Sequence, residues 1–207
     1  MDILFTIFSL LVLLFSVVIH ELAHGSIAYS LGDLTAKYQG RLTLNPIKHL
    51  DLFGSIILPL VLFISGSPVL VGWAKPVPIN PYNFRDQKWG SLKVAIAGPL
   101  TNLFLAIFFG LLIRFSPYSF IVSFEKFFIL MAYVVSINIM LALFNLLPIP
   151  PLDGHWILFS FLPESFSVAK EFLQRYGFFL LIFLLVFNGL FFLNILSDAL
   201  FNLIVGK

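Results

Sequence analysis

The segment FSVVIHELAHG, residues 15–25, places two imidazoles and a carboxylate inside an otherwise apolar run. On a helix, His20 and His24 lie one turn apart and about 40° apart around the axis, so both can face one metal ion. Glu21 lies beside them. Placing such groups in hydrocarbon costs roughly 2.5–3.5 kcal/mol for each charged residue unless partners or a metal offset that cost. We therefore interpret this segment as the centre around which the rest of the chain is arranged.

The spacing H-E-x-x-H is typical of zinc hydrolases. Two neutral imidazoles bind the ion, and the glutamate polarises the water and carries its proton. A chance match would leave three ionisable groups without purpose in an apolar span. We predict one Zn²⁺ per chain, bound by His20 and His24, with Glu21 as the general base. Because the chain contains no cysteine, any further protein ligand must be a histidine or a carboxylate.

The composition indicates the environment in which this chain folds. Hydrophobic residues make up 60% of the 207 residues and charged residues 11%, and the mean hydropathy is +1.03. These values indicate an integral membrane protein. We expect an all-α polytopic bundle of transmembrane helices that forms one domain over residues 1–207, with the first apolar run retained as a span. The net charge of +2 gives no reason to expect a nucleic-acid partner.

Apolar runs predict the helices. We expect spans over residues 3–31, 94–113 and 127–147, and a last apolar region over residues 176–205 that is interrupted at Asn188-Gly189 and crosses at least once. Residues 33–51 have the composition of a loop. His49 in this loop is predicted to be a solvated residue without a role in a site.

Two stretches between the first and second spans are harder to interpret. Residues 52–74 carry no charge and are long enough to span, but they contain helix breakers. The following residues include Pro76, Pro78 and Pro81 and must be extended. An extended backbone in a membrane protein needs water or a strand partner. This Pro-rich segment could pair with an unwound substrate strand, or it could be a rigid surface loop.

Residues 145–154, NLLPIPPLDG, supply a candidate for the third metal ligand. The prolines end the preceding helix, so Asp153 is presented on irregular backbone at membrane depth, where a carboxylate needs a cation. Asp153 is therefore the best candidate, although spacing alone leaves His155 open. In the span over residues 94–113, Asn102 is expected to hydrogen-bond across the bundle. We assign Asn102 to substrate binding.

Taken together, these motifs resemble those of the site-2 protease family of intramembrane zinc metalloproteases, in its compact prokaryotic form without PDZ or CBS domains. The resemblance covers residues 15–155 and is carried by HELAH, RLTLNP, GWAKPVPINP, AGPLTN and NLLPIPPLDG. It implies zinc binding by His20, His24 and Asp153, general-base work by Glu21, and substrate handling by Asn145. One departure is His155, which follows L-D-G where the family often has a small residue.

The zinc site also constrains the topology. His20 and His24 lie near the end of the first span and Asp153 just beyond the span 127–147, so both ends must lie on one side of the membrane. With only the span 94–113 between them, residues 52–74 must make no net crossing, as a re-entrant hairpin or a helix whose extended tail returns through the protein.

The distribution of charge agrees with this topology. One side then collects nine of the twelve basic residues, which are Lys37, Arg41, Lys48, Lys75, Arg85, Lys88, Lys93, Lys170 and Arg175. A full crossing by residues 52–74 would leave six on each side and remove the positive-inside bias. We expect four net crossings, an external N-terminus, and an active site that opens to the cytoplasm of a prokaryotic cell.

The expected function is zinc-dependent hydrolysis of peptide bonds in membrane-embedded protein substrates. Two alternatives come from other classes. A zinc-binding membrane transporter would carry further acidic or histidine residues at helical spacing in a second span, and the spans outside the motifs offer only Asp198. An inactive relative that merely holds membrane proteins is disfavoured because every catalytic residue type is present.

Overall fold

The computed structural model describes residues 3–57, 61, 64–65 and 74–206. Within these residues every regular element is a helix, which confirms the predicted all-α class. The long helices are α1 (Ile3–Ser30), α4 (Gly90–Arg114), α6 (Glu125–Asn145), α8 (Ser167–Val186) and α9 (Phe191–Val205). The short ones are α2 (Thr35–Tyr38), η1 (Pro46–His49), η2 (Leu52–Ile57), η3 (Pro81–Asn83), α5 (Tyr118–Ser123), α7 (Gly154–Phe161) and η4 (Glu164–Phe166).

Three of the described helices, α1, α4 and α6, are long and apolar enough to cross a bilayer. They coincide with the three predicted spans to within a few residues. Helices α8 and α9 meet at an angle of 76°, and the pair supplies a fourth span if it is counted as one broken helix. The break contains Asn188, which has a φ of 56°, and Gly189. The predicted interruption at Asn188-Gly189 is therefore confirmed.

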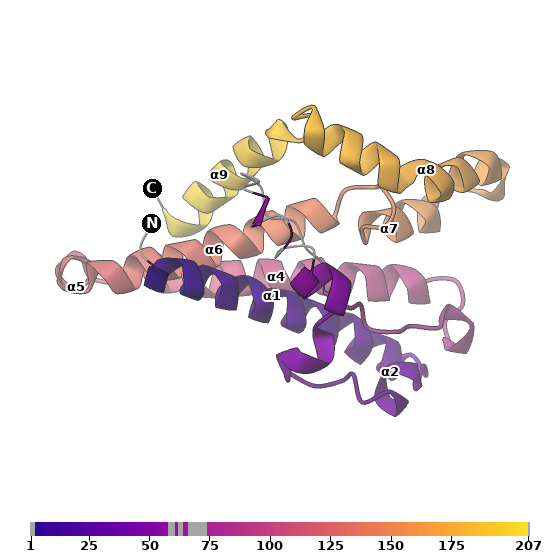
Figure 1. Cartoon of the computed structure of the whole chain (residues 1–207), viewed down its shortest axis with the longest axis horizontal. Coiled ribbons are helices and arrows are strands. Elements are labelled where there is room, and N and C mark those ends of the chain that lie inside the picture. The colour runs from indigo at the N-terminus through magenta and orange to yellow at the C-terminus, as the bar shows by residue number, and fades with distance from the viewer. Residues whose placement is uncertain (1–2, 58–60, 62–63, 66–73, 207) are drawn as a thin grey trace.

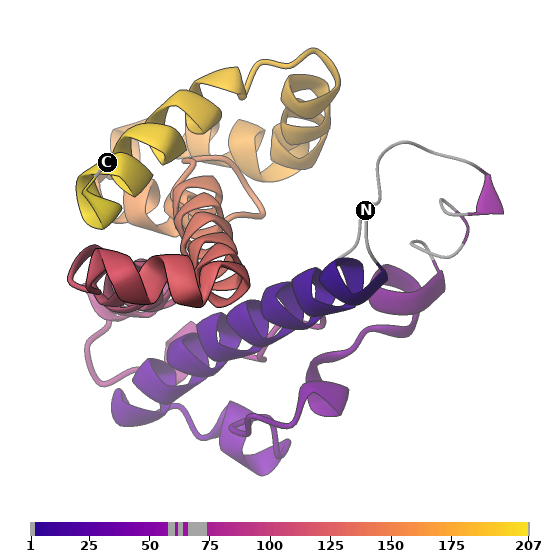
Figure 2. The same ribbon diagram turned by 90° about the vertical axis from the view of Figure 1, so that its left-hand side faces the viewer.

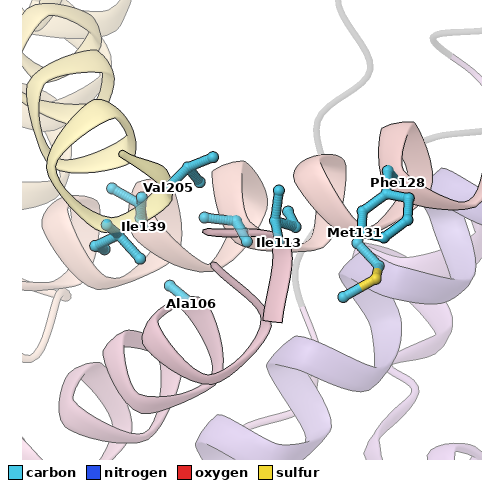
Figure 3. Packing of buried hydrophobic residues seen from close by; sticks show 8 residues of the cluster. Ala106, Ile113, Phe128, Met131, Ile139 and Val205 are labelled. Atoms are coloured by element: carbon cyan, nitrogen blue, oxygen red, sulfur yellow. The ribbon is translucent and has the colours of Figure 1, made fainter. Parts of the chain in front are cut away.

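Helix α4 lies at the centre of the bundle and packs against both α1 and α6 (Figure 1). Helices α8 and α9 cover the other side of α6, away from α1 (Figure 2). The main apolar core joins α4, α6 and α9 (Figure 3), and its buried members are Ala106, Ile113, Phe128, Met131, Val135, Ile139, Ile204 and Val205. Lipid tails are as apolar as these side chains, so helix association in a membrane depends on close packing more than on the hydrophobic effect. Gly110 of α4 permits such packing, because a Cβ there would overlap Ile204.

The chain brings α1's C-terminal end and α7 to one end of the bundle. Helix α5, the start of α1 and the end of α9 lie at the other end (Figure 1). This arrangement agrees with the requirement that the H-E-x-x-H helix and the Asp153 turn end on the same side.

The residues that flank the segment 52–74 lie next to each other. The amide of Lys75 donates a hydrogen bond of 2.8 Å to the carbonyl of His49. His49 and Lys75 therefore lie at the same level of the bundle, which is what the predicted absence of a net crossing by residues 52–74 requires. Residues 52–57 form the π-helix η2. The choice between a re-entrant hairpin and a helix with a returning tail falls largely on residues 58–60, 62–63 and 66–73, outside the described residues.

Two further expectations concern the loops at this end. Residues 74–80 are neither helix nor strand, in agreement with the predicted extended Pro-rich segment. The prediction that His49 is solvated is wrong. Its side chain is fully buried, and its ring bonds the carbonyl of Thr43 at 2.9 Å through Nε2. The loop folds back over this histidine, which the polar composition of residues 33–51 did not indicate.

The adjacency of His49 and Lys75 predicts the result of cysteine labelling. The chain has no native cysteine. Single cysteines replacing the exposed Lys48 and Lys88 are expected to react with a membrane-impermeant maleimide from the same side of the membrane, because no crossing separates them. A cysteine at Lys126, at the start of α6, serves as the opposite-side control. Labelling of Lys48→Cys and Lys88→Cys from opposite sides would contradict this topology.

Candidate metal centre

The two histidines of α1 face each other within the bundle. His20 and His24 are each 5% exposed, and their Nε2 atoms lie 3.0 Å apart. The ring centroids are 4.6 Å apart with an interplanar angle of 82°. The spacing of four residues on a helix produces this pairing, as expected from the sequence.

Asp153 joins the histidines from the far end of the chain. It immediately precedes α7, on the turn that follows α6. Its Oδ2 lies 3.0 Å from Nε2 of His20 and 3.2 Å from Nε2 of His24. Among the described residues this is the one group of three or more histidine, cysteine or acidic side chains close enough to hold a metal ion.

The triangle of Nε2, Nε2 and Oδ2 suits a small ion. Tetrahedral zinc with ligands at about 2.0–2.1 Å separates its ligand atoms by about 3.3 Å. The observed separations of 3.0–3.2 Å are close to that value. Two neutral imidazoles and a carboxylate leave a fourth tetrahedral position for water. The residues present therefore fit zinc.

Hydrogen bonds at the other ring nitrogens leave both Nε2 atoms free for an ion. Nδ1 of His20 donates to Oδ1 of Asn102 at 2.5 Å, and Nδ1 of His24 donates to the carbonyl of Val94 at 2.7 Å. With the proton on Nδ1, the lone pair of each Nε2 points toward Asp153. Metal-binding histidines in proteins are usually oriented in this way by partners at the second nitrogen.

Gly98 of α4 provides the space in front of the imidazoles. A Cβ at this position would overlap Nε2 of His24 and lie 2.5 Å from Nε2 of His20. The absence of a side chain therefore keeps open the volume beside the ligand atoms that an ion would occupy. The sequence pointed to small residues here for close helix approach, but it did not show that one of them faces the metal site.

Asn102 belongs to a buried polar network that crosses three helices. Its side-chain amide donates to Oδ1 of Asn138 on α6 at 2.8 Å, and Asn138 donates to the hydroxyl of Ser16 on α1 at 3.0 Å. Asn102 and Asn138 are fully buried. The predicted bonding of Asn102 across the bundle is confirmed, and the structure places the residue behind His20. Sequence reasoning missed Asn138, although an asparagine inside an apolar span is a signal for such a role.

Glu21 lies next to the cluster without joining it. Its Oε2 accepts a hydrogen bond of 2.8 Å from the backbone amide of Val77, in the extended Pro-rich segment. A carboxylate that accepts one N–H bond has its second oxygen available for another donor. This contact between α1 and residue 77 could not be read from the sequence.

The remaining candidates lie outside the cluster. Asn145 ends α6, and its amide donates to the carbonyl of Leu141 within the same helix at 3.0 Å. His155 is buried with Nδ1 2.5 Å from the carbonyl of Leu152, and its ring contacts Trp156 and Phe159. The structure thus brings Asp153, and not His155, to the two imidazoles. The assignment of Asn145 and Asn102 to substrate stays a prediction.

Comparisons with known proteins agree with a metalloprotease. The model of Peptidase family M50 matches residues 116–184, which include Asp153 but not His20 or His24. "Putative zinc metalloprotease YwhC" of Bacillus subtilis is 42% identical over 182 residues, which cover 84% of this chain and 77% of the relative. "Putative zinc metalloprotease MJ0611" of Methanocaldococcus jannaschii is 32% identical over 162 residues, covering 73% of this chain and 72% of the relative. No solved structure matches the chain significantly.

Gly98→Ala is expected to abolish zinc binding, because the added methyl group would occupy the space next to both Nε2 atoms. The measurement is the zinc content of the purified protein by mass spectrometry. Gly110→Ala is the matched control, since it adds the same methyl to the same helix against Ile204, away from the cluster. Stoichiometric zinc in Gly98→Ala would show that the ion does not lie between these imidazoles and α4.

Asp153→Ala is expected to lower zinc affinity far more than His155→Ala. Of these two residues, Asp153 is the one with a side-chain oxygen within 3.2 Å of Nε2 of both His20 and His24. Competition with a chelator of known affinity gives the dissociation constant of each variant. A larger loss of zinc in His155→Ala would reverse the assignment of the third ligand.

Proposed function

This chain belongs to peptidase family M50, the family of the site-2 proteases, and from that premise we propose that it is an intramembrane zinc endopeptidase that cleaves membrane-embedded proteins. The observation that carries the proposal is the convergence of His20, His24 and Asp153, with Glu21 on the next position of the same helix.

In this proposal the chain's own residues divide the work. His20, His24 and Asp153 would hold one zinc ion, which as a Lewis acid supplies a polarised carbonyl and a water that is nucleophilic near neutral pH. Glu21 accepts the proton of the attacking water and returns it to the leaving amine. The Val77 amide holds one carboxylate oxygen of Glu21, which leaves the other oxygen for the water.

The location of the cluster indicates the class of substrate. His20 and His24 lie in the second half of α1, an apolar helix that is long enough to span the bilayer. A peptide bond that reaches this depth belongs to a membrane segment. Such a segment has to unwind locally, because helical hydrogen bonding occupies the carbonyl that must be attacked.

The orientation follows from charge. With no net crossing between residues 50 and 74, nine of the twelve lysine and arginine residues fall at the end of the bundle where α1 ends. By the positive-inside rule this end lies in the cytoplasm. We therefore place the active site toward the cytoplasmic face of a prokaryotic cell membrane and the N-terminus outside.

Glu21→Gln is expected to retain zinc and fold while losing peptidase activity by about 10²–10⁴-fold, the usual contribution of a general base. Glu21 is about 100° around the helix from His20 and is not needed as a ligand. The measurement compares zinc content and cleavage in purified protein, with Glu125→Gln, an exposed glutamate on α6, as the matched control.

The same variant identifies substrates. Proteomics of membrane fractions from cells that carry the native chain or Glu21→Gln should reveal full-length membrane proteins that accumulate only with the variant. Cleavage by purified Glu21→Gln at a near-native rate would remove Glu21 from the mechanism.

A further inference from the structure

The extended segment of residues 75–80 runs along the second half of α1. Val77 donates its amide to Glu21, and its side chain packs at Gly25, where a Cβ would lie 2.9 Å from Cγ1 of Val77. Further along, Ile79 packs against the buried cluster of Ala28, Phe84 and Val94. The segment is therefore one wall of the site, and its amide at residue 77 is the group that meets the proposed general base.

The Pro-rich segment does not fix its own position through hydrogen bonds between its backbone groups. Pro76, Pro78 and Pro81 have no N–H group, so only three amides lie between Pro76 and Pro81, those of Val77, Ile79 and Asn80. Something outside the segment must fix its position along α1. Val77 is 5% exposed, so bulk solvent does not hold it.

A short unit that follows α1 binds the Pro-rich segment at both ends. We call residues 33–41 the bracket. It consists of the turn after α1, helix α2 and the turn at Gly40, which has a φ of 62°. The bracket begins with the buried anion Asp33 and ends with the buried cation Arg41, which are 0% and 6% exposed.

The anion of the bracket binds the donors of the Pro-rich segment. Oδ2 of Asp33 accepts from the amide of Asn80 at 2.7 Å, and Oδ1 accepts from the side chain of Asn83 at 2.8 Å. Oδ1 also accepts from the amide and the hydroxyl of Thr35, which starts α2. Burial raises the pKa of Asp33, but the donors from Asn80, Thr35 and Asn83 outweigh burial and hold the pKa below its ordinary value.

Arg41, the cation of the bracket, binds the backbone carbonyls of the Pro-rich segment. The guanidinium of Arg41 donates to the carbonyls of Lys75 at 2.8 Å and Pro76 at 3.1 Å, and also to the carbonyl of Lys48. A planar guanidinium can serve several carbonyls from one position, which a lysine ammonium does not reproduce. Each charge thus suits the backbone groups that it binds. Arg41 binds the carbonyls of residues 75 and 76, and Asp33 binds the amide of residue 80.

Val77 lies between these two points of attachment. Given the proposed role of Glu21, we propose that Asp33 and Arg41 are positioning residues, which hold the Pro-rich segment so that the amide of Val77 orients the carboxylate of Glu21. Neither residue touches the His20–His24–Asp153 cluster in this arrangement. Their effect is therefore on the direction of Glu21 and not on the binding of the metal ion.

These bonds also favour one of the two interpretations of the Pro-rich segment. The amides of Lys75, Val77 and Asn80 already donate within the protein, and the carbonyls of Lys75 and Pro76 already accept. A segment with so many of its backbone groups in use is held as a rigid element, which favours the rigid loop over a strand that waits for a substrate.

Hydrogen exchange at single amides tests the bracket without any substrate. Arg41→Gln and Asp33→Asn are expected to raise the exchange rates of Val77 and Asn80 by about tenfold or more, because local opening exposes both amides. Lys37→Gln, an exposed basic residue of the same bracket, should leave both rates unchanged. Unchanged rates at both amides in Arg41→Gln and Asp33→Asn would overturn the proposal.

A fourth variant tests the hydrogen bond between the Val77 amide and Glu21 separately. Glu21→Ala removes the acceptor of the Val77 amide and leaves the bracket intact, so exchange should rise at Val77 and stay constant at Asn80. This arm remains informative if a bracket variant does not fold. Equal exchange at Val77 in the native protein and in Glu21→Ala would also overturn the proposal.

Activity gives the second readout, with a fluorescein-labelled single-span transmembrane peptide in detergent micelles as the probe. Arg41→Gln and Asp33→Asn should lower kcat by about 10- to 100-fold at native zinc content and with little change in KM. A kcat that falls only in proportion to lost zinc contradicts a positioning role. If the native protein cleaves no probe, the proposed function is in question, while hydrogen exchange still decides the bracket.

Discussion

The structure depends on one constraint, the cost of keeping two imidazoles and a carboxylate together inside an apolar bundle. Each of these groups must be hydrogen-bonded or bound to an ion, because an unpaired polar group in hydrocarbon costs several kcal/mol. His20 is satisfied by Asn102 of α4, His24 by the backbone of α4, and Asp153 reaches both from the turn after α6. These bonds set the depth of α1 against α4 and the position of the turn.

Glycine makes the approach of these elements possible. Helices in a bilayer gain little from burying apolar surface, since the lipid is apolar as well, and they associate where backbones can come close. Gly98 leaves room beside the imidazoles, and Gly154 lies so close to the carbonyls of Leu146 and Leu147 that a Cβ would overlap them. The turn that presents Asp153 is further held by Leu147, Ile149 and Leu152, which pack against Leu181 of α8 and Leu193 of α9. The last two helices therefore support the turn that carries Asp153, the proposed third ligand.

The Pro-rich segment and the bracket meet a second constraint, the hydrogen-bonding needs of extended backbone. An extended backbone at the edge of a membrane domain has polar groups that no helix satisfies. Here Asp33 and Arg41 bind those groups from a loop that the chain places between α1 and the segment. The same contacts set the amide of Val77 against Glu21, so the satisfaction of the backbone and the geometry of the proposed general base depend on the same residues.

The sequence by itself determined the elements that rest on local properties. Apolar runs located α1, α4 and α6, the Asn188-Gly189 pair located the break between α8 and α9, and the spacing of His20 and His24 placed both imidazoles on one face of α1. These follow because hydropathy and helical periodicity act between residues near in the chain. The predicted zinc site required that residues 52–74 make no net crossing, and the distribution of charge agreed with it.

Only the tertiary structure decided which distant groups meet. It selected Asp153 over His155, placed Gly98 against the imidazoles, joined Asn102 to Asn138, and buried His49, which the sequence had suggested was solvated. It also showed that the amide of Val77, a group every residue except proline carries, contacts Glu21. Such contacts join residues dozens of positions apart, and their existence depends on how closely helices pack, a property that no local pattern encodes.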